Sequence, residues 1–448
     1  MAGLMAPRAL APLRHRRFRL LTAGQVTSNV GDACYAVALP WYVLANHGSV
    51  VLLGTVLAAY GIPRTALLLV GGYASDRWRP QTVMMAADIA RALAIAALAV
   101  TAAAGPARAV VLIPVAVLLG SGEGLFLPGS FAIIPSLVPG EDLQAANALA
   151  SSGTQLATLI GPAIGGALVA LAGPPLAFAL DSFSFAISAA TLAGLRAAPP
   201  APVHREAAPA ATGERAPTLG AVLRSERVIQ VILLLNIAAN IGLGGESEVA
   251  LPALAHGPLR AGAAGYGAIL AAFGAGALLG TLAAGQIRRA RRPAVAGSLA
   301  FLAEAVCTGF APYLGSTAAV AAAIAGLGIM NGFGNVITIT AFQQWAPPNL
   351  LGRLGGLLAL TSFGVFPVSV ALAALVVRDS GPAPFFLFAA ASLAVAILAA
   401  LTQKSWRDFG MDAAGRSSRR VPGTEAHAVV RENSGELSGT VPWCSTEF

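Results

Sequence analysis

The chain has 448 residues, of which 56% are hydrophobic and only 11% are charged. Soluble domains carry about 25% charged residues, so this composition excludes an ordinary soluble protein and predicts one that crosses a bilayer many times. The formal net charge of +8 does not indicate nucleic-acid binding, because the arginines fall in short segments between apolar runs and form no folded basic face.

The predicted elements are apolar runs separated by Gly, Pro and charged positions. Each is long enough to span a bilayer as a helix, which takes about 20 residues. In chain order the twelve runs lie at approximately 20–45, 50–71, 82–104, 109–134, 144–172, 175–196, 227–252, 263–287, 294–313, 316–342, 353–377 and 382–402. The sequence therefore predicts an all-α membrane protein with twelve transmembrane helices.

The remaining segments divide the chain into five parts. We expect a cytoplasmic amino-terminal segment (1–19), an amino-terminal six-helix half (20–196), a proline-rich cytoplasmic linker (197–226), a carboxy-terminal six-helix half (227–402) and a disordered cytoplasmic tail (403–448). With both termini in the cytoplasm, 23 of the 28 basic residues lie on the cytoplasmic side and 3 on the other. This is the bias expected of a multi-pass protein of the bacterial plasma membrane.

The two predicted halves are repeats of each other. Residues 57–63 and 72–80 recur as 270–276 and 285–293, and Val37–Pro40 recurs as Val249–Pro252. Repeated halves are typical of membrane transporters, which use them to build two units around a central site. We therefore expect pseudo-symmetric halves in which Gly72 corresponds to Gly285.

Polar residues recur at helical spacing in the first, fourth, seventh and tenth runs. Side chains at i, i+4 and i+7 share one helix face, and polar faces inside a bilayer line water or substrate. The candidates for a central cavity are Gln25, Asn29, Tyr35, Asn236, Asn240, Asn331, Asn335 and Thr338. We expect these faces to meet around a single cavity near the middle of the membrane.

Four acids in these runs are candidates for proton coupling: Asp32, Glu123, Glu246 and Glu248. Burial in a low-dielectric cavity favours the protonated form of a carboxyl group, so substrate and proton can compete for it. Glu246 is the near repeat counterpart of Asp32, whereas Glu248 fits the face of Asn236 and Asn240 better. The two glutamates cannot both face one cavity, since residues two apart on a helix point in different directions.

Other acids are given local roles. Asp88 and Arg91 form a structural pair at i, i+3, Asp181 caps its helix, and Glu304 is assigned no role. The three cysteines and five histidines show no ligand spacing, so we expect no metal and no cofactor. An ATP-driven pump is not indicated, because a phosphate-binding Gly-x-x-x-x-Gly-Lys loop is missing from the sequence.

Several motifs resemble those of the major facilitator superfamily over residues 20–402. Gly72, Asp76, Arg77 and Arg79 are similar to its gating motif between the second and third helices. Gly161, Pro162, Gly165 and Gly166 are similar to the helix-packing motif of its antiporter branches, and Gly31-Asp32 with Ala146–Leu149 resembles the branch of macrolide and siderophore exporters. The gating motif departs from the pattern at Pro80 and Gln81, where a final basic pair is usual.

The resemblance implies the major facilitator fold and drug:proton antiport, a function associated with drug resistance. We expect a monomeric secondary transporter that uses protons to export a small amphipathic compound, such as a drug, an antibiotic or a siderophore-like molecule, by alternating access. The alternatives are a proton-coupled importer or an uncoupled facilitator of a small metabolite. A membrane-embedded enzyme is a remote alternative, because converging catalytic residues are not evident in the sequence.

Overall fold

The computed structural model describes residues 8–45, 49–195, 226–287, 291–345 and 348–410. Those residues form helices and short connections, as expected where backbone groups in lipid must be satisfied internally. The predicted linker lies almost wholly outside the described residues, as does the tail from 411.

The amino-terminal set of helices comprises α1 to α6. Its elements are η1 (Arg8–Arg14), α1 (Arg16–Ala45), α2 (Val50–Arg77), α3 (Pro80–Ala104), α4 (Ala109–Ile133), η2 (Ile134–Ser136), η3 (Gly140–Asp142), α5 (Leu143–Ala172) and α6 (Pro174–Gly194). Local interactions determine where two of these helices begin. The Ser49 hydroxyl accepts from the Leu52 amide at 3.0 Å at the start of α2, and Gly173 takes a φ of 80° before the proline that starts α6.

The carboxy-terminal set comprises α8 to α14, with α15 packed on it. Its elements are α8 (Arg227–Gly245), η4 (Glu246–Ala250), α9 (Leu251–His256), α10 (Gly262–Gly285), α11 (Pro293–Phe310), η5 (Ala311–Tyr313), α12 (Thr317–Trp345), α13 (Pro348–Ser380), α14 (Ala383–Thr402) and α15 (Lys404–Arg407). Segment η4 is one turn of π-helix between two α-helices.

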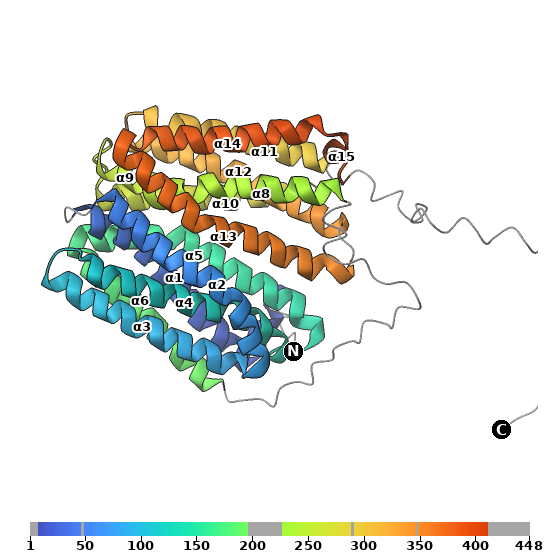
Figure 1. Cartoon of the computed structure of the whole chain (residues 1–448). Helices are drawn as coiled ribbons and strands as arrows, with labels where there is room; N and C mark the ends of the chain where they lie inside the picture. The colour runs from blue at the N-terminus through green and yellow to red at the C-terminus, as the bar shows by residue number, and fades with distance from the viewer. Residues whose placement is uncertain (1–7, 46–48, 196–225, 288–290, 346–347, 411–448) are drawn as a thin grey trace, which may run out of the picture.

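Helix pairings recur between the two sets. In the amino-terminal set α2 packs on α4, α3 on α6, and α1 on both α5 and α6; in the carboxy-terminal set α10 packs on α12, α11 on α14, and α8 on both α13 and α14. Each pairing in the first set thus has a counterpart in the second. Across the sets, α2 packs on α13 and α5 on α10, as the two bundles of Figure 1 show.

The expected count of twelve spans is not fully confirmed. Eleven of the described helical stretches are long and apolar enough to cross a membrane. Helix α1 is 30 residues long but is not one of them, because Gln25, Asn29 and Asp32 interrupt its apolar residues. Residues 404–407 fall within the expected disordered tail, yet they form helix α15, in which Trp406 is buried.

Buried apolar residues form one core where the two sets meet and separate cores elsewhere. We call the end where α1 begins, α6 ends and α8 begins the linker end. At the opposite end, one cluster contains residues of both sets, including Val43, Leu53, Val249 and Val370. At the linker end each set has its own cluster, around Phe18 in the first and around Phe342 in the second.

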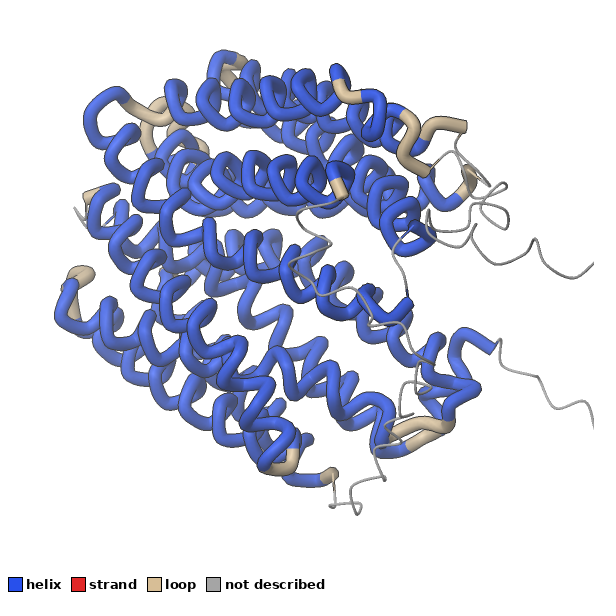
Figure 2. Tube along the Cα trace, turned by 45° about the vertical axis from the view of Figure 1, so that its right-hand side comes forward, coloured by secondary structure: helices blue, strands red, loops and turns tan. Residues whose placement is uncertain are grey.

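The sets are therefore joined at the opposite end and separate towards the linker end, where their helices diverge (Figures 1 and 2). Glycines explain the close approach at the joined end. Gly166 on α5 faces Gly267 on α10, and Gly61 on α2 faces Phe366 on α13. At the linker end of α13, in contrast, a side chain added at Gly355 or Gly356 would meet only open space.

Candidate functional site

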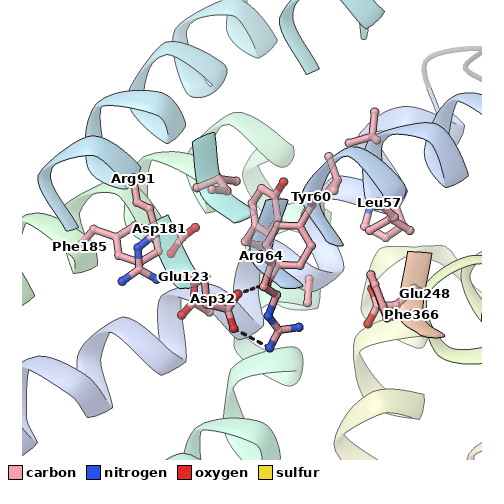
Figure 3. Close-up of a pocket in the computed structure, with 16 residues that line it drawn as sticks. Asp32, Leu57, Tyr60, Arg64, Arg91, Glu123, Asp181, Phe185, Glu248 and Phe366 are labelled. Atoms are coloured by element: carbon pink, nitrogen blue, oxygen red, sulfur yellow. Dashed lines mark hydrogen bonds and ion pairs between the residues drawn. The ribbon is translucent and has the colours of Figure 1, made fainter. Parts of the chain in front are cut away.

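A cavity of about 240 Å³ lies between the two sets, and we call it the interface cavity. Four acids and two arginines converge on it, together with apolar and aromatic side chains (Figure 3). Its lining residues are Asp32, Tyr35, Ala36, Leu39, Pro40, Val56, Leu57, Tyr60, Arg64, Arg91, Leu119, Glu123, Asp181, Phe185, Glu248 and Phe366. All but Glu248 and Phe366 come from the amino-terminal set.

Glu123 on α4 is held by two side chains of α2. Arg64 Nη2 lies 2.7 Å from Glu123 Oε1, and the Tyr60 hydroxyl donates to Glu123 Oε2. The helices can approach this closely because Gly120 and Gly124 lie against the backbone of Tyr60 and Arg64. Glu123 is therefore fixed as the partner of a half-buried cation.

Arg91 on α3 is the second cation of the interface cavity. It is 5% exposed and pairs with Asp88 one turn earlier. The rings of Phe126 and Phe185 lie 4.7 and 4.4 Å from its guanidinium carbon, which stabilises the charge away from water. The expected Asp88–Arg91 pair is therefore present, but the arginine also reaches the cavity.

Asp32, like Glu248, is an acid of this cavity without a fixed partner. Among the described residues it has neither a hydrogen bond nor an ion pair, although it lines the same cavity as Arg64 and Arg91.

Asp181 was expected to cap α6, and this is wrong: it lies inside that helix, is 1% exposed and accepts from the Ser184 hydroxyl at 3.4 Å. With Asp88 included, five carboxyl groups thus share two arginines, which leaves room for protons or a cationic group.

A second cavity, of about 440 Å³, lies inside the carboxy-terminal set, and we call it the carboxy-terminal cavity. It is lined by α8, η4, α11, α12, α13, α14 and α15. Its polar lining residues are Asn236, Asn240, Glu246, Ser298, Glu304, Thr308, Asn331, Asn335, Thr338 and Ser362. Apolar side chains, including Phe301, Phe342 and Trp406, complete its walls.

The structure therefore divides the predicted residues between two cavities, and the expectation of a single one is wrong. Asp32, Tyr35, Glu123 and Glu248 line the interface cavity. The five polar candidates of α8 and α12 line the carboxy-terminal cavity instead. The physical reason is that α8 and α12 turn their polar faces into their own set, where the Asn236 amide donates to the Leu358 carbonyl of α13 at 3.1 Å.

Glu246 and Glu248 also lie on the opposite faces from those that helical spacing indicated. Glu246 lines the cavity of Asn236 and Asn240, and Glu248 lines that of Asp32. The π-turn of η4 has more residues per turn than an α-helix, so side chains from Glu246 onward rotate relative to those of α8. A regular spacing of 3.6 residues cannot predict this.

The remaining predicted residues lie outside both cavities. Asn29 donates to Thr154 Oγ1 on α5 at 3.2 Å, and Gln25 is half-buried. Gly161 and Gly165 pack on Ala33 and Cys34 of α1, and the neighbouring Gly166 packs on α10. The motif that also contains Pro162 thus lies where α5 contacts both α1 and the other set.

The gating motif stays a prediction. Arg77 and Arg79 are exposed at the end of α2, whereas the side chain of Asp76 and the position of Gly72 in the packing lie outside what the structure describes. The expected contact of Asp76 with residues 352–356 therefore has no structural test.

Sequence reasoning gave no cavity role to Tyr60, Arg64, Arg91, Asp181 and Glu304, which line the cavities. Arg64 and Glu304 had a signal, because each places a charge well inside an apolar run, where charges are costly and face partners or cavities. Tyr60 had none, since a single tyrosine in a span is unremarkable until Glu123 is seen beside it.

Comparison with known proteins identifies the family. Residues 7–441 match the model of the transmembrane secretion effectors, a family of the major facilitator superfamily. The chain belongs to this family. The enterobactin exporter EntS of Shigella boydii serotype 4 (strain Sb227) is 26% identical over 351 residues, which are 77% of this chain and 81% of the relative. EntS of Escherichia coli O139:H28 (strain E24377A / ETEC) matches to the same extent.

Solved transporters share the fold. A POT family transporter in complex with a thioalcohol-conjugated peptide has a TM-score of 0.69 at 14% identity and covers 86% of this chain and 96% of its own. A bacterial homologue of ferroportin in an inward-facing state has a TM-score of 0.65 at 16% identity, with 88% and 98% covered. The chain is therefore a multi-pass transporter of the bacterial inner membrane for a small molecule and not an enzyme.

Proposed function

We propose that this transmembrane secretion effector is a proton-coupled exporter of a small amphipathic compound. The observation that carries the proposal is the unpaired Asp32 in a cavity between the two sets, beside two arginines that are already paired with Glu123 and Asp88. A carboxyl group without a fixed partner can exchange a proton at little structural cost, because no existing ion pair has to break.

The linker end is the cytoplasmic end in this proposal, and the structure is in an inward-facing state. Separate cores at the linker end and a shared core at the opposite end support this reading, as does the positive-inside bias of the sequence. Substrate enters from the cytoplasm when Asp32 is ionised. A proton that reaches Asp32 after the sets have rocked then favours release of the substrate outward, which is alternating access.

The charged residues of the interface cavity have different roles in this mechanism. Arg64 and Glu123 keep a fixed charge pair at the contact of α2 with α13, where the guanidinium lies 4.1 Å from the Phe363 ring centroid. Glu248 presents an acid to the same cavity from the other set. A change of charge at Asp32 therefore alters the electrostatic interactions at the surface where the two sets separate and close.

Transport in a defined host tests the proposal. A bacterium lacking its own exporters would express the chain and be screened with lipophilic amines, macrolides and the siderophore enterobactin, which the name of the relative EntS suggests. Export that stops when the pH gradient is collapsed supports proton coupling. Export that continues unchanged after collapse supports the uncoupled facilitator, and accumulation inside the cell supports the importer.

A further inference from the structure

The carboxy-terminal cavity is not used by the coupling network of Asp32, although it is the larger of the two. Its volume of about 440 Å³ lies in the range of small-molecule sites, which are mostly apolar with a few convergent polar groups. A space of this size inside one set is therefore large enough to bind a small molecule, and its lining decides which chemical class fits.

The cavity has its acids at one end, and Phe342 and Trp406 at the other. Helix α8 runs away from the linker end, so Ile232 lies near that end and Glu246 lies four turns deeper. Helices α11 and α12 agree, because Glu304 and Asn331 lie deep while Phe342 lies near the linker end. Trp406 of α15 lines the cavity at the linker end and is fixed there by its indole N–H, which donates to Ser298 Oγ at 3.1 Å.

The deep end holds two buried acids without a cation. Glu246 and Glu304 are each 6% exposed, and neither has an ion-pair partner among the residues that the structure describes. In the part of the chain that the structure describes, no arginine, lysine or histidine lines the cavity. The partners that these acids do have are neutral: the Thr308 hydroxyl for Glu246 and the Asn331 amide, at 3.2 and 3.3 Å from the two oxygens of Glu304.

The amides leave further acceptors free. The Asn335 amide nitrogen donates to the Asn331 carbonyl and side-chain oxygens, both at 3.0 Å, and the Asn240 nitrogen donates to the Asn236 carbonyl at 2.8 Å. Among the described residues nothing donates to the side-chain oxygens of Asn240 or Asn335. Two carboxyl groups and two amide oxygens therefore face the cavity as acceptors.

We infer that the carboxy-terminal cavity binds an amphipathic organic cation, with a protonated amine at Glu246 and Glu304 and an apolar frame extending towards Phe342 and Trp406. The inference rests on the proposed transport function and deepens it by naming the substrate class. An ammonium group supplies both the positive charge and the N–H donors that the deep end lacks. The apolar frame buries hydrocarbon against the walls near the linker end.

Three probes with one frame and different head groups test this inference. Binding of 4-phenylbutylamine, 4-phenylbutanol and 4-phenylbutyrate to the purified full-length protein in lipid nanodiscs would be measured by calorimetry, with empty nanodiscs subtracted. We expect the amine to bind at least about ten-fold more tightly than the alcohol, because hydrogen bonds to charged groups are stronger than neutral ones. The carboxylate should bind most weakly.

Variants locate the site. Glu246→Gln and Glu304→Gln should each weaken amine binding about ten-fold or more and change alcohol binding less than about two-fold. Glu304→Asp keeps the charge and should retain most of the amine affinity. Glu226→Gln, at an exposed position before α8, is the matched control and should bind like the unmodified protein.

Equal affinity for the amine and the alcohol, or tighter binding of the carboxylate, would overturn the inference, as would glutamine variants that bind the amine normally. If a glutamine variant does not fold, the comparison of the three probes on the unmodified protein still decides. The measurement uses no pH gradient. A failure of proton coupling therefore leaves its result intact, and a failure of amine binding leaves gradient-driven export of another compound intact.

Discussion

Arg64 Nη2 lies 2.7 Å from Glu123 Oε1, and the same guanidinium carbon lies 4.1 Å from the centroid of the Phe363 ring. The first contact joins α2 to α4 inside one set, and the second joins α2 to α13 across the two sets. One half-buried side chain thus connects the charge network of the interface cavity to the surface along which the sets meet.

The Arg64–Glu123 pair should show strong energetic coupling. Arg64→Gln or Glu123→Gln alone leaves a largely buried charge without its partner, which costs about 3 kcal/mol. The double variant removes both charges and should be more stable than the sum of the single losses predicts. Thermal unfolding of the four proteins in detergent would measure the coupling; strictly additive losses would show that the pair is screened.

Gly166 should tolerate no larger residue, unlike Gly285 at the end of α10. A Cβ at Gly166 would lie 2.8 Å from the Ala263 carbonyl oxygen and 3.0 Å from Gly267 Cα, so Gly166→Ala should force α5 and α10 apart and lower the melting temperature. Gly285→Ala is the matched control, because its Cβ would meet nothing within 4 Å. Replacing a helical glycine by alanine is otherwise favourable by about 1 kcal/mol. The two variants should therefore shift the melting temperature in opposite directions, and shifts of the same sign would contradict the tight packing.

Gly356 should matter for transport but not for folding. It is exposed at the linker end of α13, and a side chain there meets open space in this state. Closure of the linker end during alternating access would remove that space. Gly356→Leu should therefore keep the melting temperature while export falls several-fold. Normal export by this variant would contradict closure at α13.

Trp406 should contribute to the stability of the carboxy-terminal set. It is 2% exposed and stacks on Phe409 with ring centroids 5.4 Å apart. Trp406→Ala should cost about 3 kcal/mol, as other large-to-small core changes do. Lys404→Ala, at an exposed position of the same short helix, should have no measurable effect. Equal unfolding temperatures for the two variants would show that α15 is not part of the core.

Composition predicted the membrane helices, and the resemblance of short motifs predicted the family. The positions of Asp32 and Glu123 within apolar runs also predicted that they line a cavity, because such runs and the charges within them depend on local sequence alone. Spacing could not predict which set each polar face turns towards, since that depends on how helices pack in three dimensions. Asn236 illustrates this: its partners Thr361 and Ser362, at 2.8 and 2.9 Å, are more than a hundred residues away.

The exchange of Glu246 and Glu248 has a different cause. The π-turn that rotates them is a departure from regular helix geometry, and nothing in the local sequence identifies it. The missed Arg64 was predictable in principle, because an arginine in the middle of an apolar run requires a partner. Its identity as Glu123 required the contact between α2 and α4 that Gly120 and Gly124 permit.

The central claim is that Asp32 couples proton movement to export. The most direct test compares the unmodified protein with Asp32→Asn, which removes the titratable group and keeps its size, in everted membrane vesicles supplied with the compound identified by the host screen. Asp379→Asn, an exposed acid at the opposite end, is the matched control, and membrane content is equalised by immunoblot. The account predicts uptake driven by an imposed pH gradient for the unmodified protein and for Asp379→Asn, and a loss of at least about ten-fold for Asp32→Asn. Gradient-driven uptake by Asp32→Asn at the unmodified rate would contradict it.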